Sequence, residues 1–129
     1  MRKIVVSVGN GLLAEAITQM LGDSGEFQPF RVSIGSKKES LAGQCGMLSA
    51  EMLIAEVSYA IGTTVETRLS EVREIRKTLP GCKIVLLCDE NSAPDIARAV
   101  MLAKKDGLIY AFFYSSVTAI YLLAALTSL

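Results

Sequence analysis

The stretch that decides the fold lies between Val65 and Cys88 and reads VETRLSEVREIRKTLPGCKIVLLC. In its first part, apolar side chains recur every three or four residues, at Val65, Leu69, Val72, Ile75 and Leu79. This spacing predicts a helix with one apolar stripe, and Pro80-Gly81 ends it. The opposite face is charged and carries Glu66, Arg68, Glu71, Arg73, Glu74, Arg76 and Lys77. The run that follows, Lys83–Cys88, is short and apolar, as a strand buried on both faces is.

The same alternation of a buried strand and a helix occurs five times along the chain. The predicted strands are Lys3–Val8, Phe27–Ile34, Glu51–Val57, Lys83–Cys88 and Leu108–Tyr114. The predicted helices run from Asn10, as N-cap, to Gly22 and over Ser36–Met47, Val65–Leu79, Ala93–Lys105 and Val117–Leu129, the last with Ser115-Ser116 as its N-cap. Short connections between alternating strands and helices predict an α/β fold, a doubly wound (βα)5 sandwich in which helices cover both faces of a parallel sheet. Ligands of such sheets bind at the carboxyl ends of the strands, so the residues there decide function.

Composition and charge exclude several classes of protein. The chain has 129 residues, 51% of them hydrophobic, with 13 basic and 13 acidic residues and no histidine. A balanced charge without a basic stripe argues against direct nucleic-acid binding. The missing histidines exclude Ser-His and Cys-His nucleophiles and zinc sites that use histidine. Because Cys45, Cys82 and Cys88 have no metal-binding spacing, we expect reduced core thiols in a cytoplasmic protein without a metal or a cofactor.

The C-terminal part of the chain, from Gly107 to Leu129, has no charged residue. About 20 apolar residues span a bilayer, but glycine, serine and threonine interrupt this run. Leu108–Tyr114 has the aromatic character of a strand. We therefore expect a strand followed by a helix and no membrane span.

Two segments resemble the receiver domain of bacterial response regulators. Residues 71–87 read EVREIRKTLPGCKIVLL and are similar to the third helix and fourth strand of receivers, and residues 51–57 read EMLIAEV and are similar to the third strand. The resemblance extends over residues 1–129 and implies a single receiver-like domain with a flavodoxin-like fold, in which the strands are ordered 2-1-3-4-5. It places Glu56 on the position of the phosphoacceptor aspartate.

The other positions that carry receiver chemistry differ in this sequence. The resemblance places Ser7 and Val8 where receivers have the acidic pair that holds Mg²⁺. It places Cys88 at the position of a threonine or serine and Tyr114 at the position of a lysine. Phosphoryl transfer to a carboxylate needs a divalent cation and further positive charge beside the phosphoryl oxygens, and these residues supply neither. The chain therefore resembles a degenerate pseudo-receiver, which is not phosphorylated and is not an enzyme.

The carboxylate of Glu56 has two interpretations. It can imitate a phosphorylated aspartate and set a permanent signal, or it can be a solvated carboxylate at a strand end, which we favour. A weak cation site is a further hypothesis, because Asp89 and Glu90 follow the neighbouring strand and carboxylates are the ligands of Mg²⁺ and Ca²⁺.

The segment Gly9-Asn10-Gly11-Leu12-Leu13-Ala14 lies between a strand and a helix and fits the G-x-G-x-x-A pattern. Glycines in this pattern let a backbone approach a pyrophosphate, so the alternative function is a small Rossmann-like nucleotide-binding domain. The second strand ends without the acidic residue that binds ribose, and Lys37 and Lys38 after it would suit a 2′-phosphate. A tight turn explains the same glycines without a ligand.

The last predicted helix has no polar face, although a helix that covers a sheet needs only one apolar stripe. Receivers contact their partners through the fourth helix, fifth strand and fifth helix, so the resemblance and the composition indicate the same surface. The candidate interface residues are Ile120, Tyr121, Leu122 and Ala125. We expect a regulatory domain that binds a protein partner or a second copy there. It would be a stand-alone adaptor or the N-terminal part of a transcriptional regulator with a C-terminal effector domain.

Overall fold

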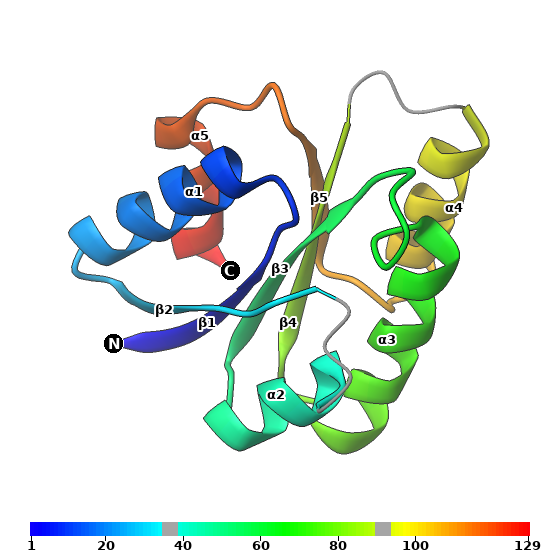
Figure 1. Cartoon of the computed structure of the whole chain (residues 1–129), viewed down its shortest axis with the longest axis horizontal. Helices are drawn as coiled ribbons and strands as arrows, with labels where there is room; N and C mark the ends of the chain where they lie inside the picture. The colour runs from blue at the N-terminus through cyan, green and yellow to red at the C-terminus, as the bar shows by residue number, and fades with distance from the viewer. Residues whose placement is uncertain (35–38, 90–93) are drawn as a thin grey trace.

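A parallel sheet of five strands forms the centre of the computed structural model, which describes residues 1–34, 39–89 and 94–129 (Figure 1). The strands are β1 (Arg2–Ser7), β2 (Phe27–Arg31), β3 (Met52–Val57), β4 (Lys83–Cys88) and β5 (Ala111–Tyr114). Their order is β2-β1-β3-β4-β5, and each neighbouring pair is parallel. The doubly wound, flavodoxin-like sheet expected from the sequence is confirmed.

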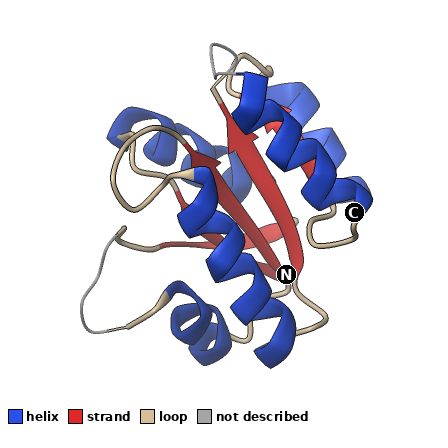
Figure 2. Ribbon diagram, turned by 90° about the vertical axis from the view of Figure 1, so that its right-hand side faces the viewer, coloured by secondary structure: helices blue, strands red, loops and turns tan. Residues whose placement is uncertain are grey.

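The described residues also form the helices α1 (Gly11–Asp23), α2 (Leu41–Leu48), α3 (Val65–Thr78), α4 (Pro94–Lys105) and α5 (Ala119–Ser128). Helices α1 and α5 cover one face of the sheet, and α2, α3 and α4 cover the other, as Figures 1 and 2 show. Strands β1, β3 and β4 supply both cores, because successive side chains of a strand point to opposite faces. Val5 and Leu53 belong to the core under α2, α3 and α4, and Ile4 and Ile54 belong to the core under α1 and α5.

Polar side chains set the first residue of four helices. Asn10, Ser40, Thr64 and Thr118 each accept a hydrogen bond from the backbone N–H three residues later. Such an N-cap satisfies a donor that has no partner within the helix. The predicted cap of α5 at Ser115-Ser116 is wrong, because the Ser115 N–H donates to the Cys88 carbonyl at 2.7 Å and prolongs the sheet.

The limits of three elements differ most from the prediction. Helix α2 begins at Leu41, and the first residues of the helix predicted from Ser36 lie outside the described residues. Strand β2 ends at Arg31, three residues before the predicted end at Ile34. It lies at an edge of the sheet, as Pro29 within it predicts. Strand β5 begins later than predicted, because the Leu108 N–H closes α4 by donating to the Ala103 carbonyl at 2.9 Å.

The uncharged C-terminal segment folds as strand β5 and the ten-residue helix α5, as predicted. Among the described residues, none of the helices combines the length and the apolar character that crossing a membrane requires.

The three cysteines provide a test of the core. Cys45, Cys82 and Cys88 are free thiols and are buried. Burial raises the pKa of the Cys45 thiol to about 12 and those of Cys82 and Cys88 to about 11. Since the thiolate is the reactive form, we expect the folded protein to resist alkylation by iodoacetamide near pH 8. Intact mass should show three labels only after denaturation; rapid labelling of any cysteine in the folded protein would contradict this core.

Candidate functional site at the carboxyl edge of the sheet

The positions that the receiver resemblance singled out lie at one edge of the sheet. Ser7 ends β1, Glu56 is the next-to-last residue of β3, and Cys88 and Tyr114 end the paired strands β4 and β5. Ser7, Val8 and Cys88 are almost fully buried, at 1%, 2% and 2% exposure, whereas Tyr114 is 42% exposed. The structure therefore brings these residues to the edge where a ligand would bind, but it buries three of them in the core.

The carboxylate of Glu56 is part of a hydrogen-bonded turn. Its Oε1 accepts a hydrogen bond from the backbone N–H of Gly9 at 2.9 Å, which ties β3 to the connection between β1 and α1. A Cβ atom at Gly9 would lie 3.2 Å from Ile34 Cδ1 and 3.3 Å from Glu56 Oε1, so glycine fits this close approach without displacing a neighbour. The Glu56 carboxylate therefore does more than face solvent, because it also holds a backbone donor.

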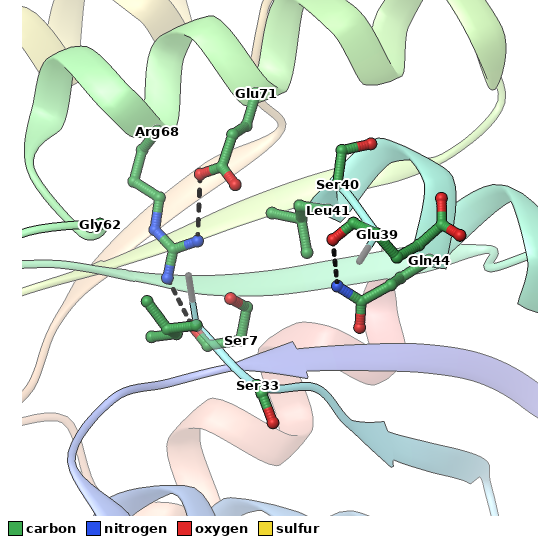
Figure 3. Close-up of a pocket in the computed structure, with 10 residues that line it drawn as sticks. Ser7, Ser33, Glu39, Ser40, Leu41, Gln44, Gly62, Arg68 and Glu71 are labelled. Carbon is green, nitrogen blue, oxygen red and sulfur yellow. Dashed lines mark hydrogen bonds and ion pairs between the residues drawn. The ribbon is translucent and has the colours of Figure 1, made fainter. Parts of the chain in front are cut away.

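A buried arginine lies beneath this edge (Figure 3). Arg68 is on α3 and is 2% exposed. Its Nε donates to the Glu56 carbonyl at 2.7 Å, and its Nη2 donates to the Ser7 carbonyl at 2.8 Å. Its Nη1 donates to Glu71 Oε1 at 3.2 Å, which is also the ion pair that balances its charge. One guanidinium therefore joins α3 to the last residues of two neighbouring strands.

The sequence pattern predicts Arg68 on the charged, solvent-facing side of α3, and that prediction is wrong. Val65, Arg68, Val72 and Ile75 are the buried residues of α3, and their spacing of three, four and three residues is that of one helical stripe. Leu69 is partly buried and packs against the same core, and Arg68 can be buried beside it because two backbone carbonyls accept its donors. The sequence did contain a sign of this: Arg68 lies at the helical spacing of the buried apolar residues Val65 and Val72.

Burial controls the electrostatics of this pair. It lowers the pKa of Arg68, although Glu71 and Glu56 oppose that shift. It raises the pKa of Glu71, and the attraction of Arg68 offsets this only in part. A guanidinium remains charged at any physiological pH. The Arg68 guanidinium is therefore permanently charged, but Glu71 balances that charge, and its Nε, Nη1 and Nη2 atoms each donate to a protein acceptor.

A polar cavity of about 110 Å³ lies beside Arg68 (Figure 3). Its described lining comes from the ends of β1 and β2, from α2 with the residues just before it, and from α3 with the loop that leads into it. At about 30 Å³ for each water in the liquid, this space suits a few water molecules.

The hypothesis of a cation site at Glu56, Asp89 and Glu90 cannot be completed, because Glu90 lies outside the described residues. Within the described ranges, no group of three or more acidic, cysteine or histidine side chains is placed to hold a metal ion.

The contacts of the glycine-rich segment favour a structural turn over a nucleotide site. The Gly9 N–H is bonded to the Glu56 carboxylate, and the Leu13 N–H donates to Asn10 Oδ1 at 3.1 Å. Two donors that a pyrophosphate would use are thus occupied, and a carboxylate beside them repels phosphate. Lys37 and Lys38, the proposed partners of a 2′-phosphate, lie outside the described residues.

The predicted interface residues of α5 do not all lie on the same side of the helix. Ile120 and Tyr121 are 85% and 62% exposed, whereas Leu122 is 3% exposed and belongs to the core under α1 and α5. Ala125 is half-buried. The prediction is therefore wrong for Leu122, because this residue and Leu126, one turn later, form the stripe that packs against the sheet.

Comparison with known proteins identifies the fold. No protein-family model and no curated protein sequence matches the chain significantly. A DNA-binding response regulator of the LuxR family from Staphylococcus aureus is similar with a TM-score of 0.76 and 14% identity over 99% of this chain and 98% of that one. The chemotaxis protein CheY4 of Vibrio cholerae gives 0.71 and 15% over 99% and 98%. A pilus assembly-related protein of Burkholderia pseudomallei gives 0.70 and 14% over 99% and 88%. At these identities the likeness confirms the receiver-like fold and nothing finer.

The role of Arg68 can be tested by its replacement. We expect Arg68→Met to lower the free energy of unfolding by about 2–4 kcal/mol, because it leaves two carbonyls and the Glu71 carboxylate without their donor. Arg73 is exposed on the same helix, so Arg73→Met is the matched control and should change stability by less than about 0.5 kcal/mol. Urea unfolding followed by circular dichroism measures both. Equal stabilities of the two variants would show that the guanidinium does not hold the edge.

The glycine-rich segment gives a second test. If Gly9 and Gly11 serve the turn alone, millimolar NAD, NADP or ATP should leave the melting temperature unchanged, because a ligand that binds the folded state stabilises it by mass action. Differential scanning fluorimetry measures the shift. A saturable rise of several degrees with any of these nucleotides would favour the Rossmann-like alternative.

Proposed function

We propose that the chain is a phosphorylation-independent pseudo-receiver, a signalling domain that acts by contact with other proteins. The observation that carries this proposal is the buried Arg68, whose guanidinium bonds to the Ser7 and Glu56 carbonyls beneath the edge where receivers carry out their chemistry. Its fold-level similarity to response regulators supports a regulatory role. The domain would extend over the whole of residues 1–129.

The lack of phosphorylation follows from charge. A phosphoryl group that moves to a carboxylate spreads negative charge over three oxygens, and catalysis consists largely of stabilising that charge. Ser7 and Val8 offer no carboxylate to a divalent cation, and both are buried. Arg68 lies beside this edge, but its Nε, Nη1 and Nη2 atoms already donate to protein acceptors. A domain of this kind would be set in one state.

The output would come from an apolar surface that extends from α4 across β5 to α5, in agreement with the surface that receivers use. Its exposed apolar side chains are Met101, Leu102, Tyr110, Tyr114, Ile120 and Tyr121. Strand β5 is also the edge of the sheet, with β4 as its neighbour in the described residues, and neither charge nor proline protects it. Exposed apolar patches of this kind mark interaction sites.

The partner would decide the output. The similar structures include a DNA-binding response regulator and a pilus assembly-related protein, so the same fold serves more than one kind of system. We propose a protein partner, an effector domain in the same polypeptide or a second copy at this surface, in a cytoplasmic protein.

The absence of phosphorylation is tested with acetyl phosphate and Mg²⁺. We expect the intact mass of the protein to stay unchanged under conditions that phosphorylate an active receiver treated in parallel, since Ser7 and Val8 offer no carboxylate that would hold Mg²⁺ beside Glu56. The matched control is Glu56→Gln, which removes the candidate acceptor. A phosphoryl group that adds to the wild-type chain and not to Glu56→Gln would overturn the proposal.

A further inference from the structure

The loop between β3 and α3 is a built feature that the proposed function does not use. Two backbone bonds close it, from Ser58 N–H to the Thr63 carbonyl at 2.8 Å and from Thr63 N–H to the Ala60 carbonyl at 3.1 Å. The hydroxyls of Ser58 and Thr63 bond to each other, and Ser58 Oγ also accepts from the Ala60 N–H. Thr63 is 3% exposed, so the base of the loop is anchored in the domain.

This anchored loop holds the apolar side chain of Ile61 in solvent. Its tip is Tyr59, Ala60 and Ile61, and Ile61 is 99% exposed, the highest value among the large apolar side chains described. Tyr59 is 66% exposed. A tip that is fixed before binding loses little conformational entropy in a complex, which is why rigid apolar anchors dominate binding energy. Glu66, exposed in the first turn of α3, adds a negative charge after the loop.

The outer face of α4 offers an apolar surface with basic residues, which could accept an apolar tip that has an acidic neighbour. A shallow groove of about 630 Å³ runs along this helix and is lined by Pro94, Ala97, Arg98, Met101, Leu102 and Lys105. Its floor is apolar, with Met101 and Leu102 at 57% and 55% exposure. The two charged residues in this lining are both basic, so among the described residues the groove is apolar with a positive rim. An apolar tip followed by the acidic Glu66 matches the groove both in its apolar character and in its charge.

We propose that a second copy of the chain occupies the α4 groove, by inserting its loop tip there. The contact is head-to-tail, because the tip and the groove are different surfaces, and each copy offers both. Assembly can therefore continue from copy to copy, into a ring or an open chain. The tip is smaller than the roughly 800 Å² per partner of a standard interface, so we expect affinity in the micromolar range or weaker. The contact does not involve the phosphorylation chemistry, so its failure would leave the proposed pseudo-receiver role untouched.

Two single variants separate the two sides of this contact. Ile61→Asp places a charge on the tip, and Met101→Asp places a charge in the groove. Both side chains are exposed, so both variants should keep the wild-type melting curve. Met47→Asp is the matched control, because Met47 is 77% exposed on α2 and belongs to neither surface.

Sedimentation velocity over a concentration series into the high-micromolar range measures the assembly. We expect the wild-type chain and Met47→Asp to form growing oligomers, and Ile61→Asp and Met101→Asp each to remain monomeric. An equimolar mixture of Ile61→Asp and Met101→Asp should form dimers and nothing larger, because one variant retains the groove and the other the tip. Added salt should weaken every complex through the charged rim.

Two results would overturn the head-to-tail contact. If the wild-type chain stays monomeric throughout, the two surfaces do not bind each other. If Ile61→Asp assembles like the wild-type chain while Met101→Asp or Tyr121→Glu does not, a symmetric contact through α4, β5 and α5 takes its place, and the surface named in the proposed function stands without the loop tip.

Discussion

A guanidinium that is shut away from water determines how the carboxyl edge of this domain is built. Arg68 on α3 reaches the carbonyls of Ser7 on β1 and Glu56 on β3, and Glu71 one turn later balances its charge. An ion that is buried without partners costs several kcal/mol, so these acceptors must be in place whenever the helix packs on the sheet. The position of α3, and with it the loop that precedes the helix, therefore depends on the strand ends.

This constraint changes what the edge can do. A divalent cation can enter or leave a site, so a domain that needs Mg²⁺ has two states between which a signal can choose. Arg68 belongs to the chain, stays charged and cannot dissociate. Glu56 adds a second fixed connection, because its carboxylate holds the Gly9 N–H. Both contacts support the proposal that the edge keeps one conformation and is not switched by phosphorylation.

The sequence predicted the fold because every strand is a run of apolar residues and most helices carry one apolar stripe. It could not predict the role of Arg68, since residue type alone assigns a charged side chain to the surface; the buried carbonyls that accept its donors come from strands far away in the chain. The prediction that Leu122 is exposed at an interface was wrong for the opposite reason. When every residue of a helix is apolar, as in α5, composition does not tell which side faces the sheet, and packing selects Leu122 and Leu126.

A fixed edge also limits how such a domain can carry information. If no ligand or modification changes the conformation of the edge, a signal has to enter as a change in the concentration, location or occupancy of the surfaces that the domain presents. The exposed apolar side chains are consistent with this, because they lie on rigid elements: Ile61 on a hydrogen-bonded loop, Met101 on α4 and Ile120 on α5. Rigid surfaces lose little conformational entropy on binding, so the fraction that is occupied depends mainly on the concentration of the partner.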